Sequence, residues 1–70
     1  MNSEELRVAI TRANVSLREL ADKLGVSEQA FYNKLNGRTE FKNSEILKLA
    51  KILGLSMKSV NLIFFGNGVN

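Results

Sequence analysis

The apolar residues of this chain recur at intervals of three and four positions, which is the spacing of one face of an α-helix. The first such stripe consists of Leu6, Ala9, Ile10 and Ala13. It predicts a helix from Ser3 to Ala13, which Asn2 caps and for which Glu5 completes a capping box. Arg7 and Arg12 fall off the stripe, so we expect them to face solvent or a partner.

Three later helix starts share one device, an apolar residue, a serine, and a second apolar residue four positions after the serine. The three sets are Val15, Ser16 and Leu20; Val26, Ser27 and Phe31; and Leu55, Ser56 and Val60. With a further stripe of Ile46, Leu49, Ala50 and Leu53, they predict helices at Leu17–Leu24, Glu28–Asn36, Ser44–Leu53 and Met57–Phe64. Leu47 and Ile52 broaden the fourth stripe, which indicates contact with more than one neighbour. The fold class is therefore all-α, in one domain over residues 1–70 whose last few residues fray or contribute to a dimer.

The second and third predicted helices, Leu17 to Asn36, have the spacing of a helix-turn-helix, two short helices joined by three or four residues. Gly25 lies just past the first of them, where positive φ closes the last turn. Ala21 lies four residues earlier, where a small side chain lets a second helix approach closely. A generic helical hairpin in a small bundle is the alternative. The polar outer face of the next helix favours the DNA-binding motif.

That helix has two unlike faces. At 100° per residue Phe31 and Leu35 point one way, while Gln29, Asn33 and Asn36 cluster on the other side with Tyr32 beside them. Planar amides donate and accept together at the N6/N7 edge of adenine in a major groove. The alternative is that these are solvated polar residues without a ligand.

Composition removes several classes of site. The 70 residues include no cysteine and no histidine, so disulfides, thiolate chemistry, the usual zinc sites and imidazole catalysis are excluded. We find no nucleophile–base pair, so we expect no enzyme, no catalytic residue, no metal, no cofactor and no small-molecule ligand. No apolar run approaches a membrane span.

Charge is divided unevenly along the chain. Residues 1–33 carry four basic and five acidic side chains, whereas residues 34–70 carry six basic and two acidic ones. The excess begins at the end of the third predicted helix, where a polyanion would lie. Arg38 and Lys42, in the loop after that helix, are candidate phosphate contacts, or else ordinary exposed cations. Phe41, between them, is interpreted as a plug closing the core rather than a stacking platform.

One family joins these observations. The residues concerned are Leu20-Ala21-x-x-Leu24-Gly25-Val26-Ser27, then Phe31, Leu35-Asn36-Gly37, and Ile46-x-x-Leu49-Ala50-x-x-Leu53-Gly54-Leu55-Ser56. This pattern resembles the Cro/CI-type, or XRE-type, helix-turn-helix family over nearly the whole chain. The resemblance implies a five-helix repressor-like domain that binds double-stranded DNA and regulates transcription in bacteria or their phages. It further implies a dimer on a two-fold symmetric operator and a cytoplasmic location.

The resemblance also implies roles for individual residues. The positions that match groove-facing residues are Ser27, Glu28, Gln29, Tyr32 and Asn33. Those that match phosphate contacts are Ser16, Leu17 and Arg18, followed by Asn36, Arg38, Lys42 and Asn43. Glu28 departs from the family, which commonly has an amide or basic group there. The chain also ends soon after the fifth helix, which favours a Cro-like regulator over a full-length CI-like repressor, unless this is an excised domain.

The end of the chain carries more apolar residues than the core needs. Leu62 and Phe65 cannot easily share the inward direction of Val60 and Ile63, and Val69 either folds back or frays. Leu62, Phe65 and Val69 are the apolar residues that the core needs least, so we expect them to form the dimer interface. The alternative for Phe65 is a place in the core. The alternative function is a protein-interaction module, such as an antirepressor or antitoxin, that uses this apolar surface.

Overall fold

The computed structural model describes residues 1–66. This part of the chain contains five helices and no strand. They are α1 (Ser3–Ala13), α2 (Leu17–Leu24), α3 (Glu28–Leu35), α4 (Asn43–Leu53) and α5 (Met57–Phe64). The all-α prediction is confirmed. Two bounds shift by one residue, because α3 ends at Leu35 with Asn36 as its C-cap and α4 begins at Asn43 with Lys42 as its N-cap.

Side chains cap four of the five helix starts. Asn2, Ser16, Ser27 and Ser56 each accept a hydrogen bond from the amide three residues on, at 3.0–3.1 Å. These caps satisfy amides that have no partner within the helix. The capping box predicted at Glu5 is wrong, because the Asn2 amide that it requires donates instead to the carbonyl oxygen of Ile63, at 2.7 Å. This bond ties the start of α1 to α5.

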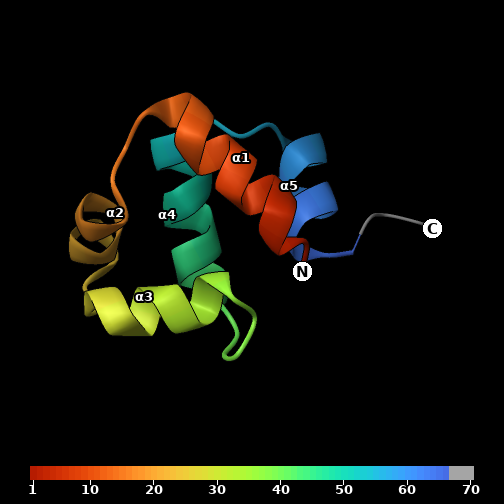
Figure 1. The fold of residues 1–70 in the computed structure, drawn as a ribbon. Coiled ribbons are helices and arrows are strands. Elements are labelled where there is room, and N and C mark those ends of the chain that lie inside the picture. The colour runs from red at the N-terminus through yellow and green to blue at the C-terminus, as the bar shows by residue number, and fades with distance from the viewer. Residues whose placement is uncertain (67–70) are drawn as a thin grey trace.

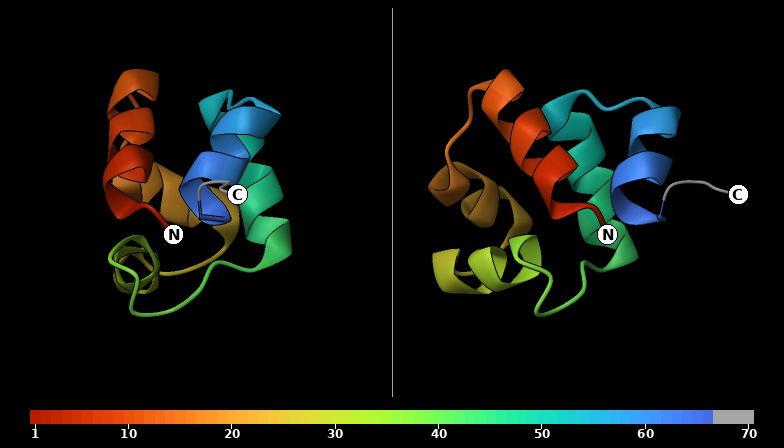
Figure 2. Two further views of the ribbon diagram at one scale, coloured as in Figure 1. Left: turned by 90° about the vertical axis from the view of Figure 1, so that its right-hand side faces the viewer. Right: turned by 45° about the vertical axis from the view of Figure 1, so that its right-hand side comes forward.

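Helices α1, α2 and α5 all contact α4. Helix α1 crosses in front of α4, with α5 at their side, while α2 lies on the opposite side of α4 from α5 (Figure 1). Helix α3 runs across the lower end of the molecule, and the loop that follows it hangs beside that end in the turned views (Figure 2). On α3 the side chains of Gln29 and Tyr32 are exposed.

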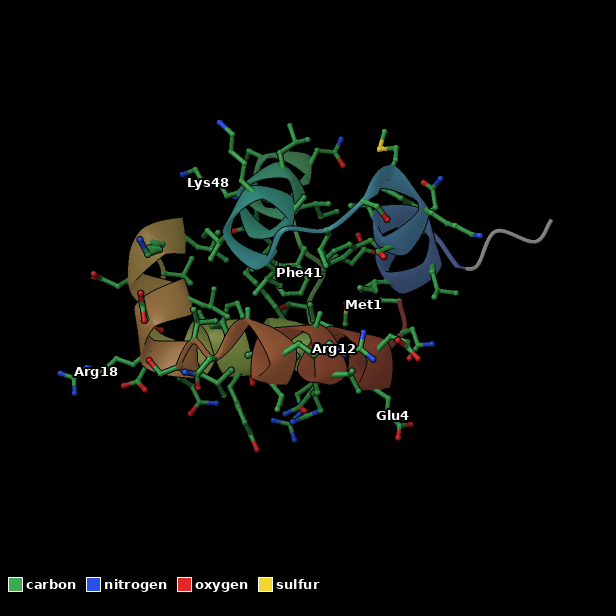
Figure 3. The ribbon with its side chains drawn as sticks, turned by 90° about the horizontal axis from the view of Figure 1, so that it is seen from above. Met1, Glu4, Arg12, Arg18, Phe41 and Lys48 are labelled. Atoms are coloured by element: carbon green, nitrogen blue, oxygen red, sulfur yellow. The ribbon has the colours of Figure 1, made fainter. Side chains whose placement is uncertain are left out.

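The core forms where these helices meet. Its buried members are Leu6, Ile10, Leu20, Ala21, Leu24, Phe31, Leu35, Leu49 and Ile63. Phe41 meets Phe31 and Phe64 edge-on, with ring centroids 5.8 and 5.6 Å apart, and points into the middle of the molecule (Figure 3). Its interpretation as a plug is confirmed.

Leu47 is the error in the predicted packing. Ile52 packs against the core as expected, but Leu47 is 71% exposed on the outer face of α4. Helical spacing places a residue on a face without saying whether another element covers that face, and none covers it here among residues 1–66. Within the same range no helix has the length and apolar character that a membrane crossing requires.

Candidate functional site

A short turn holds α2 against α3. Gly25 adopts φ +75°, and the amide of Val26 then donates to the carbonyl of Ala21 at 3.0 Å. Ala21 itself is 2% exposed, so its small side chain lies where the two helices approach. The positive φ at Gly25 is as predicted. The turn fixes the direction in which α3 leaves α2.

The two faces of α3 are separated as the sequence indicates. Phe31 and Leu35 are buried in the core. On the other side Gln29 and Tyr32 are exposed and Asn33 is half-buried, while Ser27 and Glu28 are exposed at the start of the helix. Ser27 is also the N-cap, with its hydroxyl oxygen 3.0 Å from the amide of Ala30. Four of the five predicted groove-facing residues are thus exposed, and a hydrogen bond joins Gln29 to the half-buried Asn33.

Arginines from two other segments reach the asparagines of this surface. The Oδ1 atom of Asn33 accepts from Nε2 of Gln29 at 3.3 Å and from Nη1 of Arg38 at 3.4 Å. Arg7 of α1 donates through Nη2 to Oδ1 of Asn36. Because guanidinium groups are donors only, both contacts engage the amide oxygen and leave the amide NH2 group for another acceptor.

A second contact fixes the far end of α3 to α4. Lys34 Nζ lies 3.2 Å from Oε1 of Glu45, and it also donates to the carbonyl of Glu40 at 3.2 Å. The same Glu45 oxygen accepts from the amide of Lys42 at 2.8 Å and so begins α4. The ion pair is largely shielded, since the two side chains are 12% and 9% exposed. It joins the end of α3 to the start of α4.

These neighbours set the charge of Glu45. Burial raises the pKa of this carboxyl, but hydrogen bonds from the Lys42 amide and the Lys34 ammonium, together with the charges of both lysines, outweigh burial. The net effect holds the pKa of Glu45 below its ordinary value. The ammonium group of Lys34 is paired with Glu45 and largely shielded. The accessible positive charge in the segment after α3 comes from Arg38 and Lys42.

The remaining predicted phosphate contacts lie at two other places. Ser16 caps α2 and Arg18 is exposed on its first turn, pointing outward in Figure 3, while Leu17 packs against the core. Lys42 and Asn43 are exposed at the start of α4 rather than in a loop, as that helix begins one residue early. Lys48, further along α4, projects on the other side of the view from Glu4 of α1 (Figure 3).

The predicted dimer residues lie on α5 and beyond it. Leu62 is 45% and Phe65 60% exposed, so Phe65 does not belong to the core of the chain. Val60 and Ile63 are buried, as predicted. Val69 lies outside the described residues.

The sequence did not identify three residues that shape this surface. Arg7 was recognised only as a residue off the apolar stripe, and its partner Asn36 lies 29 positions away. Lys34 and Glu45 carry no local signal of pairing, because their contact depends on where α4 begins. Residues 1–66 contain no cluster of three or more acidic side chains that could hold a metal ion.

A family model described as "Protein of unknown function (DUF739)" matches residues 5–67. The match includes all of α2 to α5 and all but the first two residues of α1. No curated protein and no solved structure matches the chain.

Proposed function

The chain belongs to the DUF739 family, and we propose that it is a sequence-specific double-stranded DNA-binding regulator of transcription. The observation that carries the proposal is the face of α3 opposite Phe31 and Leu35, on which Gln29 and Tyr32 are exposed and Asn33 is half-buried. An amide-rich helix face of this kind matches the donor and acceptor pattern of a major groove. The proposal treats α2, its turn and α3 as a helix-turn-helix, with α3 as the recognition helix.

Cations beside this face support the same proposal. Arg38 and Lys42 are exposed next to the end of α3, and Arg18 is exposed on the first turn of α2. Capped helix starts at Ser16 and Ser27 add partial positive charge for phosphate oxygens. Phosphate contacts of this kind position a recognition helix without reading sequence.

We place this activity in a Cro-like regulator of a phage or a bacterium that acts in the cytoplasm by occluding a promoter. Two copies would bind a pseudo-palindromic operator, with recognition helices about 34 Å apart in successive major grooves. No catalytic step, metal or cofactor enters the proposal. The resemblance of the sequence to Cro/CI-type proteins supports it, together with the exposed α3 face.

Salt dependence tests the proposal. The logarithm of the affinity for duplex DNA should fall linearly with the logarithm of salt concentration, with a slope of about 0.9 for each phosphate contacted. Lys42→Ala should reduce the slope by about one contact. Lys58→Ala removes the same charge from α5 and should leave the slope unchanged. If both variants changed the slope equally, DNA would not lie beside Lys42 as proposed. If the protein bound no duplex at all, the proposed function would be wrong.

The second candidate is a protein-interaction module, because Leu62 and Phe65 expose apolar surface on and after α5. An antirepressor or antitoxin of this kind would show little or no salt-dependent retardation of duplex DNA. Selection of bound sequences from random duplexes separates the two, since only the regulator enriches a defined motif.

A further inference from the structure

The side chain of Asn33 is held in one orientation by its neighbours. Its Oδ1 atom accepts from Nε2 of Gln29 at 3.3 Å and from Nη1 of Arg38 at 3.4 Å. A guanidinium group has five donors and no acceptor, so only the oxygen of an amide can face it. Arg38 therefore determines which end of the Asn33 amide is presented outward.

The backbone keeps Arg38 beside Asn33. The amide of Arg38 donates to the carbonyl of Asn33 at 2.9 Å, which folds the chain back onto the end of α3. Gly37 permits this reversal with φ +82°. The start of the Arg38 side chain is thus fixed, and its guanidinium needs little further ordering to reach Asn33.

This arrangement changes what each amide can read. Recognition of adenine by a single amide needs both its oxygen and its nitrogen, at N6 and N7 of the base. The oxygen of Asn33 is already engaged twice, so Asn33 presents its NH2 group as a donor. Gln29 donates one of its two amide N–H groups to Asn33, and its oxygen remains available as an acceptor.

We propose that Gln29 and Asn33 form one reading unit whose polarity Arg38 sets, so that Asn33 donates to an acceptor in the major groove, N7 or O6 of a purine or O4 of thymine. Cytosine is rejected at that position, because its major-groove group is a donor. Arg38 is then a positioning residue for sequence readout as well as a phosphate contact. This inference rests on the proposed function and makes it more specific.

The test is a double-mutant cycle on discrimination rather than on affinity. Asn33→Ala identifies the base position whose preference is lost, and the ratio of binding to purine and cytosine duplexes at that position is measured for each variant. Arg38→Ala should reduce this ratio about fivefold to tenfold, the effect of one hydrogen bond. In the Asn33→Ala background, Arg38→Ala should change the ratio no further.

Lys42→Ala is the matched control, because Lys42 is also a cation after α3 and none of the side-chain hydrogen bonds among residues 1–66 joins it to Asn33. It should weaken binding to all duplexes and leave the ratio unchanged. Thermal melting of every variant checks that the fold is retained.

Three results would overturn the inference. The first is a purine-to-cytosine binding ratio that Arg38→Ala leaves unchanged. The second is a ratio that is lower in the double variant than in Asn33→Ala alone. The third is a preference of the unmodified protein for cytosine at the base position identified by Asn33→Ala. In each case the proposed function survives if the protein still selects a motif. Failure of the unmodified protein to select any motif overturns the proposed function itself.

Discussion

Glu45 shows how a single buried charge organises its surroundings. It is 7% exposed and is the one buried charged residue of the described chain. Its carboxylate accepts from the Lys42 amide and pairs with Lys34, so both the start of α4 and the end of α3 depend on it. Removal of one member of such a pair leaves the other without compensation.

Stability should therefore fall with acid in a way that depends on Glu45. Its pKa is lower in the folded than in the unfolded chain, so its contribution is present above the unfolded pKa and is lost as pH falls through the folded pKa. Glu45→Gln should cost about 1–3 kcal/mol at neutral pH and less in acid. Urea unfolding of both proteins from pH 7 to pH 3 measures this. Parallel pH dependence would show that Glu45 contributes no pH-linked stability.

Gly25 is constrained by its backbone and not by its neighbours. A Cβ atom built there meets nothing within 4 Å, yet φ is +75°. Gly25→Val should cost about 1–2 kcal/mol or more, because left-handed backbone is unfavourable for a β-branched residue. Gly25→Asn should cost less, since asparagine tolerates this region. Chemical denaturation compares the two, and equal losses would show that φ is not the cause.

At the scale of elements, the predictable features are those encoded within a few residues. Serine caps and the apolar residues on either side of them located the starts of α2, α3 and α5, because the capping bond spans only three positions. The start of α4 was missed by one residue, since its N-cap is Lys42 and the cap comes from Glu45.

In the candidate site, too, the features that could be predicted are those encoded within a few residues. The accessible face of α3 followed from helical periodicity. The orientation of its amides did not, because Arg7 and Arg38 come from other segments and reach them only in the folded chain. The contact predicted for Leu47 was wrong for a related reason, since the exposure of this side chain depends on which elements pack beside α4.

Substitutions on the two faces of α3 should have opposite consequences. Gln29→Ala and Asn33→Ala should keep the fold and each cost roughly 1–3 kcal/mol against the preferred duplex. Phe31→Ala, 0% exposed in the core, should cost about 3–5 kcal/mol of stability. Because a small domain is stable by only about 5 kcal/mol, a loss of this size would leave much of the protein unfolded.

Circular dichroism melting and duplex binding, measured on the same samples, distinguish the two faces. Unchanged base discrimination in both amide variants would place the recognition surface elsewhere on the molecule. A stable Phe31→Ala protein would contradict the assignment of the core.

At the scale of the whole molecule, the proposed DNA-binding regulator would need two copies on one operator. One recognition helix reads only a few base pairs, so a unique operator requires a second copy. Leu62 and Phe65 are exposed on the side of the molecule formed by α5, away from α2 (Figure 1). A symmetric contact there would use each of them twice.

Phe65→Glu should give a folded monomer that binds a full operator much more weakly and retains half-site contacts. The fold should survive because Phe65 is 60% exposed. Leu47→Glu is the control, since it adds the same charge at an exposed apolar residue on α4. Sedimentation and thermal melting test both variants. A Phe65→Glu protein that still dimerises would move the interface elsewhere.

The bond from the Asn2 amide to the carbonyl of Ile63 makes one amide proton a reporter on the contact between the start of α1 and α5. An amide that precedes a helix ordinarily exchanges with solvent deuterium at nearly the rate of an unfolded peptide, because local fraying exposes it. Here exchange requires the bond to the Ile63 carbonyl of α5 to open. Its protection factor should therefore follow the opening of α5, and should drop when Ile63 is truncated to alanine while amides in the middle of α2 retain more of theirs.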